Sequence, residues 1–106
     1  MKRAIFMGDT LERIRKFPQK AQSEAGYEIY RVQVGLEPKD WKPLKTVGPG
    51  VREIRIRDDN GAFRVIYVAN FADTVYVLHA FKKKTQATAK RELDLASRRL
   101  AQLTRN

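Results

Sequence analysis

The feature that most constrains the fold is an Asn60-Gly61 pair between two stretches of alternating apolar and polar residues. These stretches, Val51–Asp58 and residues 62–69, have the period of two that is typical of β-strands with one buried face. Asn-Gly is a strong signal for a tight turn, because both residues tolerate positive φ. The sequence therefore predicts an antiparallel β-hairpin over residues 51–69.

The turn also predicts which side chains share a face of the hairpin. With Asn60 and Gly61 as the loop, Arg57 lies opposite Arg64, and Arg55 lies one step further along the same face. Like charges directly opposite each other destabilise a sheet, whereas guanidinium groups are well suited to binding phosphate. We call this side of the sheet the arginine face and predict that it binds phosphate. The alternative is a solvated face on which Glu53 pairs with Arg55.

The remaining elements complete an α+β fold. We expect a short strand at Arg3–Phe6, a helix over residues 11–17, a second helix from Pro18 to Gly35, and a third long strand over residues 75–81. A final helix follows, with Thr85 or Thr88 as its cap. This order indicates an antiparallel twisted sheet of about four strands with two N-terminal helices and a C-terminal helix. All helices are expected on one face of the sheet, which leaves the other face free.

Helical spacing identifies the residues expected to face the core. In the second helix these are Phe17, Ala21, Ala25, Ile29, Val32 and Leu36. In the last helix they are Ala89, Leu93, Ala96, Leu100 and Leu103. Residues 38–50 are rich in Pro and Gly and read as an irregular connection, anchored by Trp41 and Leu44.

Composition narrows the class of partner. The 106 residues support a single domain over 1–106, and 22 Lys and Arg against 12 Asp and Glu give a net charge of +10. Such charge favours a polyanionic partner, either a nucleic acid or an acidic protein. The chain has no cysteine, which fits a reducing, cytoplasmic setting. The longest apolar run, residues 65–69, is too short to cross a membrane.

A second basic segment follows the third strand. Lys82 and Lys83 extend the arginine face if the strands pair suitably, but the register is open. If Arg64 pairs with His79, the only histidine joins the arginine face. A slip of one residue places Ala80 opposite Arg64 and turns Lys82 toward that side.

Several kinds of catalytic site are missing from the sequence. There is no Gly-rich phosphate loop, no metal-ligand spacing, and no Ser/His/Asp arrangement. With one histidine and no cysteine, a zinc site is not expected, and no cofactor is implied. An enzyme of this composition would stabilise its transition state with positive charge.

Nearly the whole chain resembles the RelE/HigB superfamily of toxins from type II toxin–antitoxin systems, and in particular its phage-derived HigB-like branch. The resemblance is carried by Lys42-Pro-Leu-Lys45, Gly48-Pro-Gly-Val-Arg-Glu-Ile-Arg55, Phe63-Arg-Val-Ile-Tyr67 and Leu78-His-Ala-Phe-Lys-Lys-Lys-Thr85. It implies a metal-independent mRNA endonuclease, acting on the translating ribosome by attack of a ribose 2′-hydroxyl on the adjacent phosphate. It also implies a cognate helix-turn-helix antitoxin that masks the basic face.

Carried onto this chain, the resemblance places six residues in the catalytic site. Arg64 and Arg57 stabilise the charge of the phosphorane, with Arg55 beside them. His79, or a lysine of lowered pKa, moves the protons, with Lys82 and Lys83 as the candidates. The tyrosine that well-known RelE proteins carry near the C-terminus has no counterpart here. Two other functions remain open, a ParE-like gyrase inhibitor without nuclease activity and a non-catalytic RNA-binding or phage module.

Overall fold

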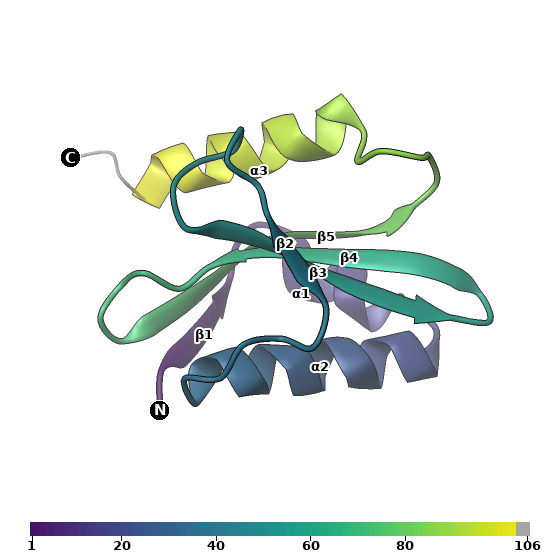
Figure 1. Ribbon diagram of the computed structural model, residues 1–106, viewed down its shortest axis with the longest axis horizontal. Coiled ribbons are helices and arrows are strands. Elements are labelled where there is room, and N and C mark those ends of the chain that lie inside the picture. The colour runs from purple at the N-terminus through teal and green to yellow at the C-terminus, as the bar shows by residue number, and fades with distance from the viewer. Residues whose placement is uncertain (104–106) are drawn as a thin grey trace.

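In the computed structural model, which describes residues 1–103, a five-stranded sheet lies between helices (Figure 1). Along the chain the elements are β1 (Arg3–Phe6), α1 (Thr10–Arg15), α2 (Gln19–Gln33), β2 (Trp41–Pro43), β3 (Val51–Asp58), β4 (Gly61–Val68), β5 (Thr74–Lys83) and α3 (Lys90–Leu103). The order across the sheet is β1-β5-β4-β3-β2.

The α+β class is confirmed, but the predicted sheet of about four antiparallel strands is wrong in two respects. First, β1 pairs with β5 in parallel, so the sheet is mixed. Second, the connection expected to be irregular contains β2, whose Trp41–Pro43 pairs with β3. Proline lacks the N–H that a central strand needs, but it is tolerated on an edge strand such as β2. The prolines at 38 and 43 are therefore the reason that the sequence did not predict this strand.

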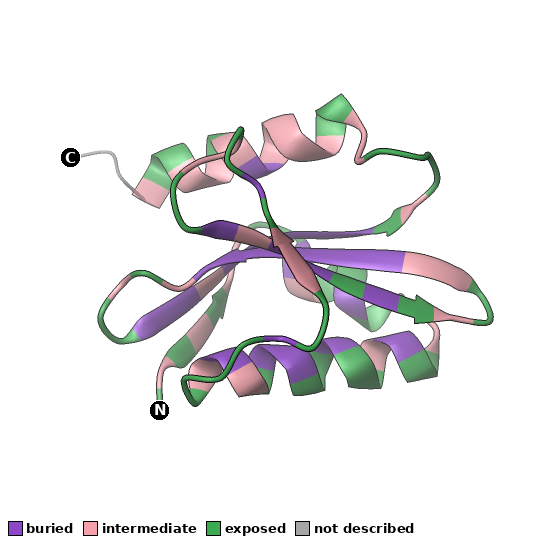
Figure 2. Cartoon of the chain, in the orientation of Figure 1, coloured by how far each residue is buried: buried purple, intermediate pink, exposed green. Residues whose placement is uncertain are grey.

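The helices cover both faces of the sheet, and the prediction of one free face is wrong. In Figure 1, α1 and α2 lie on one side of the sheet and α3 lies on the other. One apolar cluster joins α1 and α2 to the sheet and includes Ile54, Phe63 and Val65. A second cluster joins Ala96 of α3 to Ile66 and other sheet residues. Because both faces are covered, six successive residues of β4, 63–68, are buried, as the purple band in Figure 2 shows.

A β-bulge in β5 adapts the sheet to α3. Ile66 pairs with His79 and Tyr67 pairs with Val77, so Leu78 is an extra residue on β5. Leu78 packs in the second apolar cluster, and His79 contacts Glu92 of α3. The bulge therefore presents two successive side chains to the same helix.

The predicted α2 is confirmed, with one error at its end. Pro18 stands at its N-cap, and Ala21, Ala25, Ile29 and Val32 are buried as expected. Leu36, in contrast, is 52% exposed. The helix ends at Gln33, and Gly35 then adopts a φ of +90°, which turns the chain away from the core before Leu36.

Two other expectations concern the connections. Leu44 is buried, as predicted for an anchor, and Trp41 stacks under the guanidinium of Arg52, whose Cζ lies 3.8 Å from the ring centroid. Neither predicted threonine directly precedes α3, which begins at Lys90; the Thr85 hydroxyl donates to the carbonyl of Ala87 and the Thr88 hydroxyl donates to Glu53. None of the helices in residues 1–103 is long and apolar enough to cross a membrane.

Candidate nucleic-acid interface

The β3–β4 turn places the arginines in a register that differs from the predicted one. Asp58 pairs with Gly61, so the loop residues are Asp59 and Asn60, and Arg64 lies opposite Arg55 rather than Arg57. The side chain of Asp58 accepts a 2.7 Å hydrogen bond from the backbone N–H of Asn60, which closes the turn one residue earlier than predicted. Gly61 supplies the positive φ, +131°.

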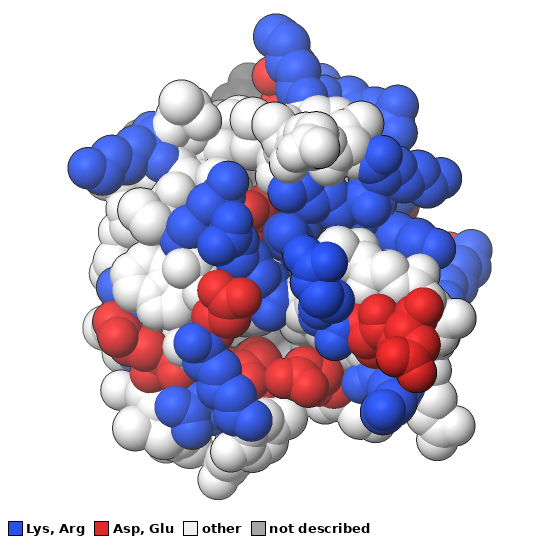
Figure 3. Space-filling view, turned by 45° about the vertical axis from the view of Figure 1, so that its right-hand side comes forward, with Lys and Arg blue, Asp and Glu red and all other residues white. Residues whose placement is uncertain are grey.

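The shift moves each pairing by two residues and therefore leaves the face of every side chain unchanged. Arg55, Arg57 and Arg64 share one side of the sheet, and two arginines do lie directly opposite each other, as predicted. This is the side on which α3 packs, but α3 covers the part that carries Ile66 and leaves Arg55 and Arg57 exposed. Lys and Arg side chains gather in the upper half of Figure 3, and most of the visible acidic side chains lie below them, with further Lys and Arg beside these.

A buried carboxylate lies under the arginine face. Glu53 is 0% exposed, and its Oε1 lies 3.7 Å from Nζ of Lys42 and 3.8 Å from Nε of Arg64. Its Oε2 accepts a 2.7 Å hydrogen bond from the Thr88 hydroxyl. The Glu53–Arg55 pair of the alternative reading is not formed. Arg55 instead lies 3.8 Å from Asp40, because Asp40 flanks β2 and reaches Arg55 from the edge of the sheet.

Arg64 is the most buried of the three arginines, with 4% of its surface exposed. Its Nη1 donates a 3.0 Å hydrogen bond to the carbonyl of Phe63. Burial lowers the pKa of Arg64, the nearby Glu53 carboxylate raises it, and Arg55 and Arg57 lower it further. An arginine keeps its charge under such shifts, so Arg64 presents a fixed cation at the base of this face.

The third long strand follows neither of the two registers considered for it. Arg64 lies opposite Phe81, and His79 and Lys83 lie at ladder positions on the same side of the sheet as Arg64. Lys82 lies opposite Phe63, on the side of α1 and α2, with its Nζ 5.9 Å from the Phe63 ring centroid. The structure therefore brings Lys83 to the arginine face and directs Lys82 away from it.

His79 occupies the arginine side of the sheet but is covered by α3. It is 0% exposed, its Nε2 lies 2.7 Å from Oε1 of Glu92, and its ring stacks on Phe81. Burial lowers the pKa of His79, while Glu92 raises it. A side chain enclosed in this way joins α3 to β5 and has no surface to offer a substrate.

Lys83 is a half-buried lysine whose pKa is lowered by its position beside the arginine face. Desolvation lowers its pKa, and Arg64, Lys42 and Arg55 lower it further, against an opposing effect of Glu53. A lysine with lowered pKa has a larger neutral fraction near neutral pH, and only the neutral amine can accept a proton. The arrangement thus places fixed cations beside a lysine whose pKa they lower.

Sequence reasoning missed three features of this site: the role of Glu53 as the partner of Arg64, the contribution of Lys42, and the contribution of Thr88. One signal was present in the sequence, because Glu53 stands at an arginine-face position of an alternating strand whose other face is apolar. The pairing with Lys42 needed β2, and the bond from Thr88 needed the path of the chain into α3. Neither could be read from local patterns.

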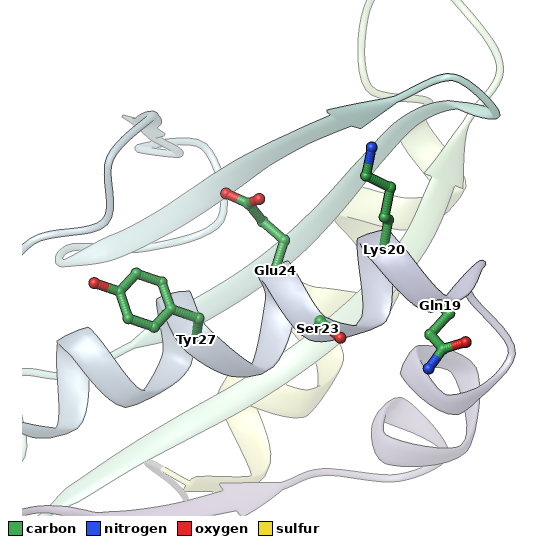
Figure 4. A pocket seen from close by; sticks show the side chains of 5 residues that line it. All are labelled: Gln19, Lys20, Ser23, Glu24 and Tyr27. Atoms are coloured by element: carbon green, nitrogen blue, oxygen red, sulfur yellow. The ribbon is translucent and has the colours of Figure 1, made fainter.

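Two of the larger hollows on the described surface lie away from the arginine face, while a small one is lined in part by Phe81, Lys83 and Glu92. One, of about 450 Å³, is formed by exposed side chains that project from α2, namely Gln19, Lys20, Ser23, Glu24 and Tyr27 (Figure 4). Another, of about 350 Å³, lies beside Phe63 and Lys82. Within residues 1–103, no three His, Asp or Glu side chains gather closely enough to hold a metal ion.

Comparison with known proteins identifies the family. A search of curated proteins finds no match. Residues 12–101 match the family model described as "Phage derived protein Gp49-like (DUF891)". The matched segment runs from α1 into α3 and includes every residue of the arginine face named above. The chain therefore belongs to the phage-derived Gp49-like family, a family of RelE/HigB-like toxins.

Proposed function

We propose that this protein is the HigB-like toxin of a type II toxin–antitoxin pair and that it cleaves mRNA on the translating ribosome without a metal ion. The observation that carries the proposal is the Arg55–Arg64 pair, two cations directly opposite each other on the arginine face, with Arg55 exposed and Arg64 buried at its base. A like-charged pair destabilises the sheet. A phosphate bound between the two guanidinium groups turns this repulsion into attraction.

The reaction follows from the groups on this face. The ribose 2′-oxygen forms a bond to the adjacent phosphorus, the bond to the 5′-oxygen breaks, and a 2′,3′-cyclic phosphate and a 5′-hydroxyl result. Arg64, held in place by its neighbours, stabilises the charge that develops on the phosphorane, while Arg55 and Arg57 bind the RNA backbone. Neutral Lys83 accepts the proton of the 2′-hydroxyl, and the ammonium so formed returns it to the leaving 5′-oxygen.

The exposure of the arginine face supports the antitoxin part of the proposal. Arg55 and Arg57 are exposed, on a chain whose net charge is +10. An acidic segment of a helix-turn-helix antitoxin that covered this face would block RNA and neutralise the charge in one contact.

Expression in growing bacteria, followed by mapping of mRNA 5′ ends, tests this function. We expect new 5′ ends within translated frames, and their loss in Arg64→Ala. Arg15→Ala is the control for the loss of one positive charge, because Arg15 is an exposed arginine on α1, on the opposite side of the sheet. Intact mRNA together with stalled replication would indicate a gyrase inhibitor, and absence of toxicity would indicate a non-catalytic binding module.

A further inference from the structure

We infer that Glu53 is a positioning residue for Arg64, and that it holds the guanidinium in the orientation that phosphoryl transfer requires. The inference rests on the proposed function. Glu53 is 0% exposed, so RNA cannot reach its carboxylate. Any effect of Glu53 on cleavage must therefore act through other groups of the site, either the cations that contact it or Lys83, whose pKa it raises.

The contacts of Arg64 show how its position is set. Nη1 donates to the carbonyl of Phe63 on its own strand, and Nε faces Oε1 of Glu53 at 3.8 Å across the ladder. Among the described residues, neither this Nε nor this Oε1 makes a hydrogen bond. Two sides of the guanidinium are thus oriented by the protein, and no hydrogen bond to residues 1–103 is found at Nη2. Nη2 is the end that we expect to meet the phosphate.

Glu53 is itself oriented from the opposite direction. The Thr88 hydroxyl donates to its Oε2 at 2.7 Å, from the segment that leads into α3. Lys42, at 3.7 Å from Oε1, adds a second cation, so the single carboxylate faces two positive groups. The carboxylate therefore joins β2, β4 and the approach to α3 at one buried point, and a shift in any of them changes the position of Arg64.

Glu28 provides a matched control for the buried charge. It is 2% exposed, and its Oε1 lies 3.7 Å from Nε of Arg31 and accepts a 3.0 Å hydrogen bond from the backbone N–H of Lys39. Glu28 lies on α2, which packs on the other face of the sheet. Glu28→Gln and Glu53→Gln thus remove the same charge from equally buried positions, but only Glu53 contacts Arg64.

The test is a double-mutant cycle on RNA cleavage by the full chain on ribosomes. We expect Glu53→Gln to lower kcat by about 100-fold with little change in KM, because a misplacement of about 1 Å in a catalytic group has an effect of this size. In the Arg64→Ala background, Glu53→Gln should cause no further loss, since the two residues act as a unit. Glu28→Gln should leave kcat unchanged and should be additive with Arg64→Ala.

A second readout does not depend on activity. The NMR signal of the Arg64 Nε–H should shift and exchange faster with solvent in Glu53→Gln, but not in Glu28→Gln. If Glu53→Gln does not fold, Thr88→Val serves instead, with an expected 3- to 10-fold lower kcat, the equivalent of about one hydrogen bond. Wild-type kcat together with an unchanged Arg64 signal in the variant used would overturn the inference.

The same experiment separates this inference from the proposed function. If the wild type cleaves, Arg64→Ala cleaves much more slowly, and Glu53→Gln cleaves at the wild-type rate, the function stands and the role of Glu53 is refuted. Full additivity of Glu53→Gln with Arg64→Ala would also refute that role. If the wild type does not cleave RNA, both the proposed function and the role of Glu53 are refuted.

Discussion

The attachment of α3 to the rest of the fold leads to a prediction about acid stability. Asp9, just before α1, accepts hydrogen bonds from Nη2 of Arg99 at 2.7 Å and from Nε of Arg13 at 2.8 Å. Arg99 extends from α3 and also donates to the carbonyl of Leu78 and to the hydroxyl of Thr10. Asp9→Asn removes the negative charge and keeps an oxygen that can accept a hydrogen bond, so the variant isolates the effect of the charge.

The size of the effect follows from the pKa of Asp9. The hydrogen bonds from Arg99 and Arg13 lower this pKa from 3.8 to about 2. At 1.36 kcal/mol per pKa unit, the difference corresponds to about 2.4 kcal/mol. The side chain of Asp9 is 44% exposed, so solvent screening reduces the contribution to about 1 kcal/mol. We therefore expect Asp9→Asn to lower the free energy of unfolding at neutral pH by about 1 kcal/mol.

The sign of the pH dependence is defined by the direction of the shift. Because the pKa is lower in the folded state, the stabilisation is fully present above pH 3.8, the ordinary value, and is lost as the pH falls through about 2. Urea unfolding of the wild type and Asp9→Asn, measured from neutral pH down to about pH 2, tests this. With an m-value of about 1.5 kcal/mol/M, the midpoints should differ by about 0.7 M near neutral pH.

Comparing the two proteins at each pH removes the contribution of all other carboxyl groups. The gap in midpoints should shrink below about pH 4 and close near the folded-state pKa. A gap that stays constant over this range would show that the charge of Asp9 does not stabilise the attachment of α3. No gap at neutral pH would refute the magnitude as well.

Three further predictions concern the arginine face. Because the pKa of Lys83 is lowered, the cleavage rate should rise with pH and level off below the usual lysine range. In a pH–rate profile, Lys83→Arg should abolish this rise, whereas Lys82→Ala, on the other face of the sheet, should retain it. His79→Gln should reduce the free energy of unfolding by about 1–3 kcal/mol, because it alters the contact with Glu92, and should retain cleavage. A loss of activity without a loss of stability would contradict a structural role for His79. Arg55→Met should weaken RNA binding and make the slope of log affinity against log salt shallower by about 0.7, as measured by fluorescence titration, and an unchanged slope would argue against a phosphate contact at Arg55.

Local pattern was sufficient for most elements and for the face of each arginine. The alternation in Val51–Asp58 predicted β3 with its observed bounds, and Arg3–Phe6 was likewise predicted as a strand. The side of the sheet on which Arg55 and Arg64 lie depends only on a period of two, so it was predicted correctly although the predicted turn was wrong. The register itself depended on one hydrogen bond from the Asn60 N–H to the Asp58 side chain, which the Asn-Gly signal did not reveal.

The sequence by itself therefore determined most of the elements, the basic charge and the presence of opposed arginines, because these follow from periodicity and composition along a continuous segment. Only the tertiary structure decided which part of the arginine face is open. The apolar side of α3 packs against Ile66 and Leu78, on the face of the sheet that had been expected to be free. That packing enclosed His79, left Lys83 beside Arg64, and brought Thr88 to a buried Glu53 35 residues away along the chain. Such contacts join distant segments through burial and charge, and no local pattern encodes them.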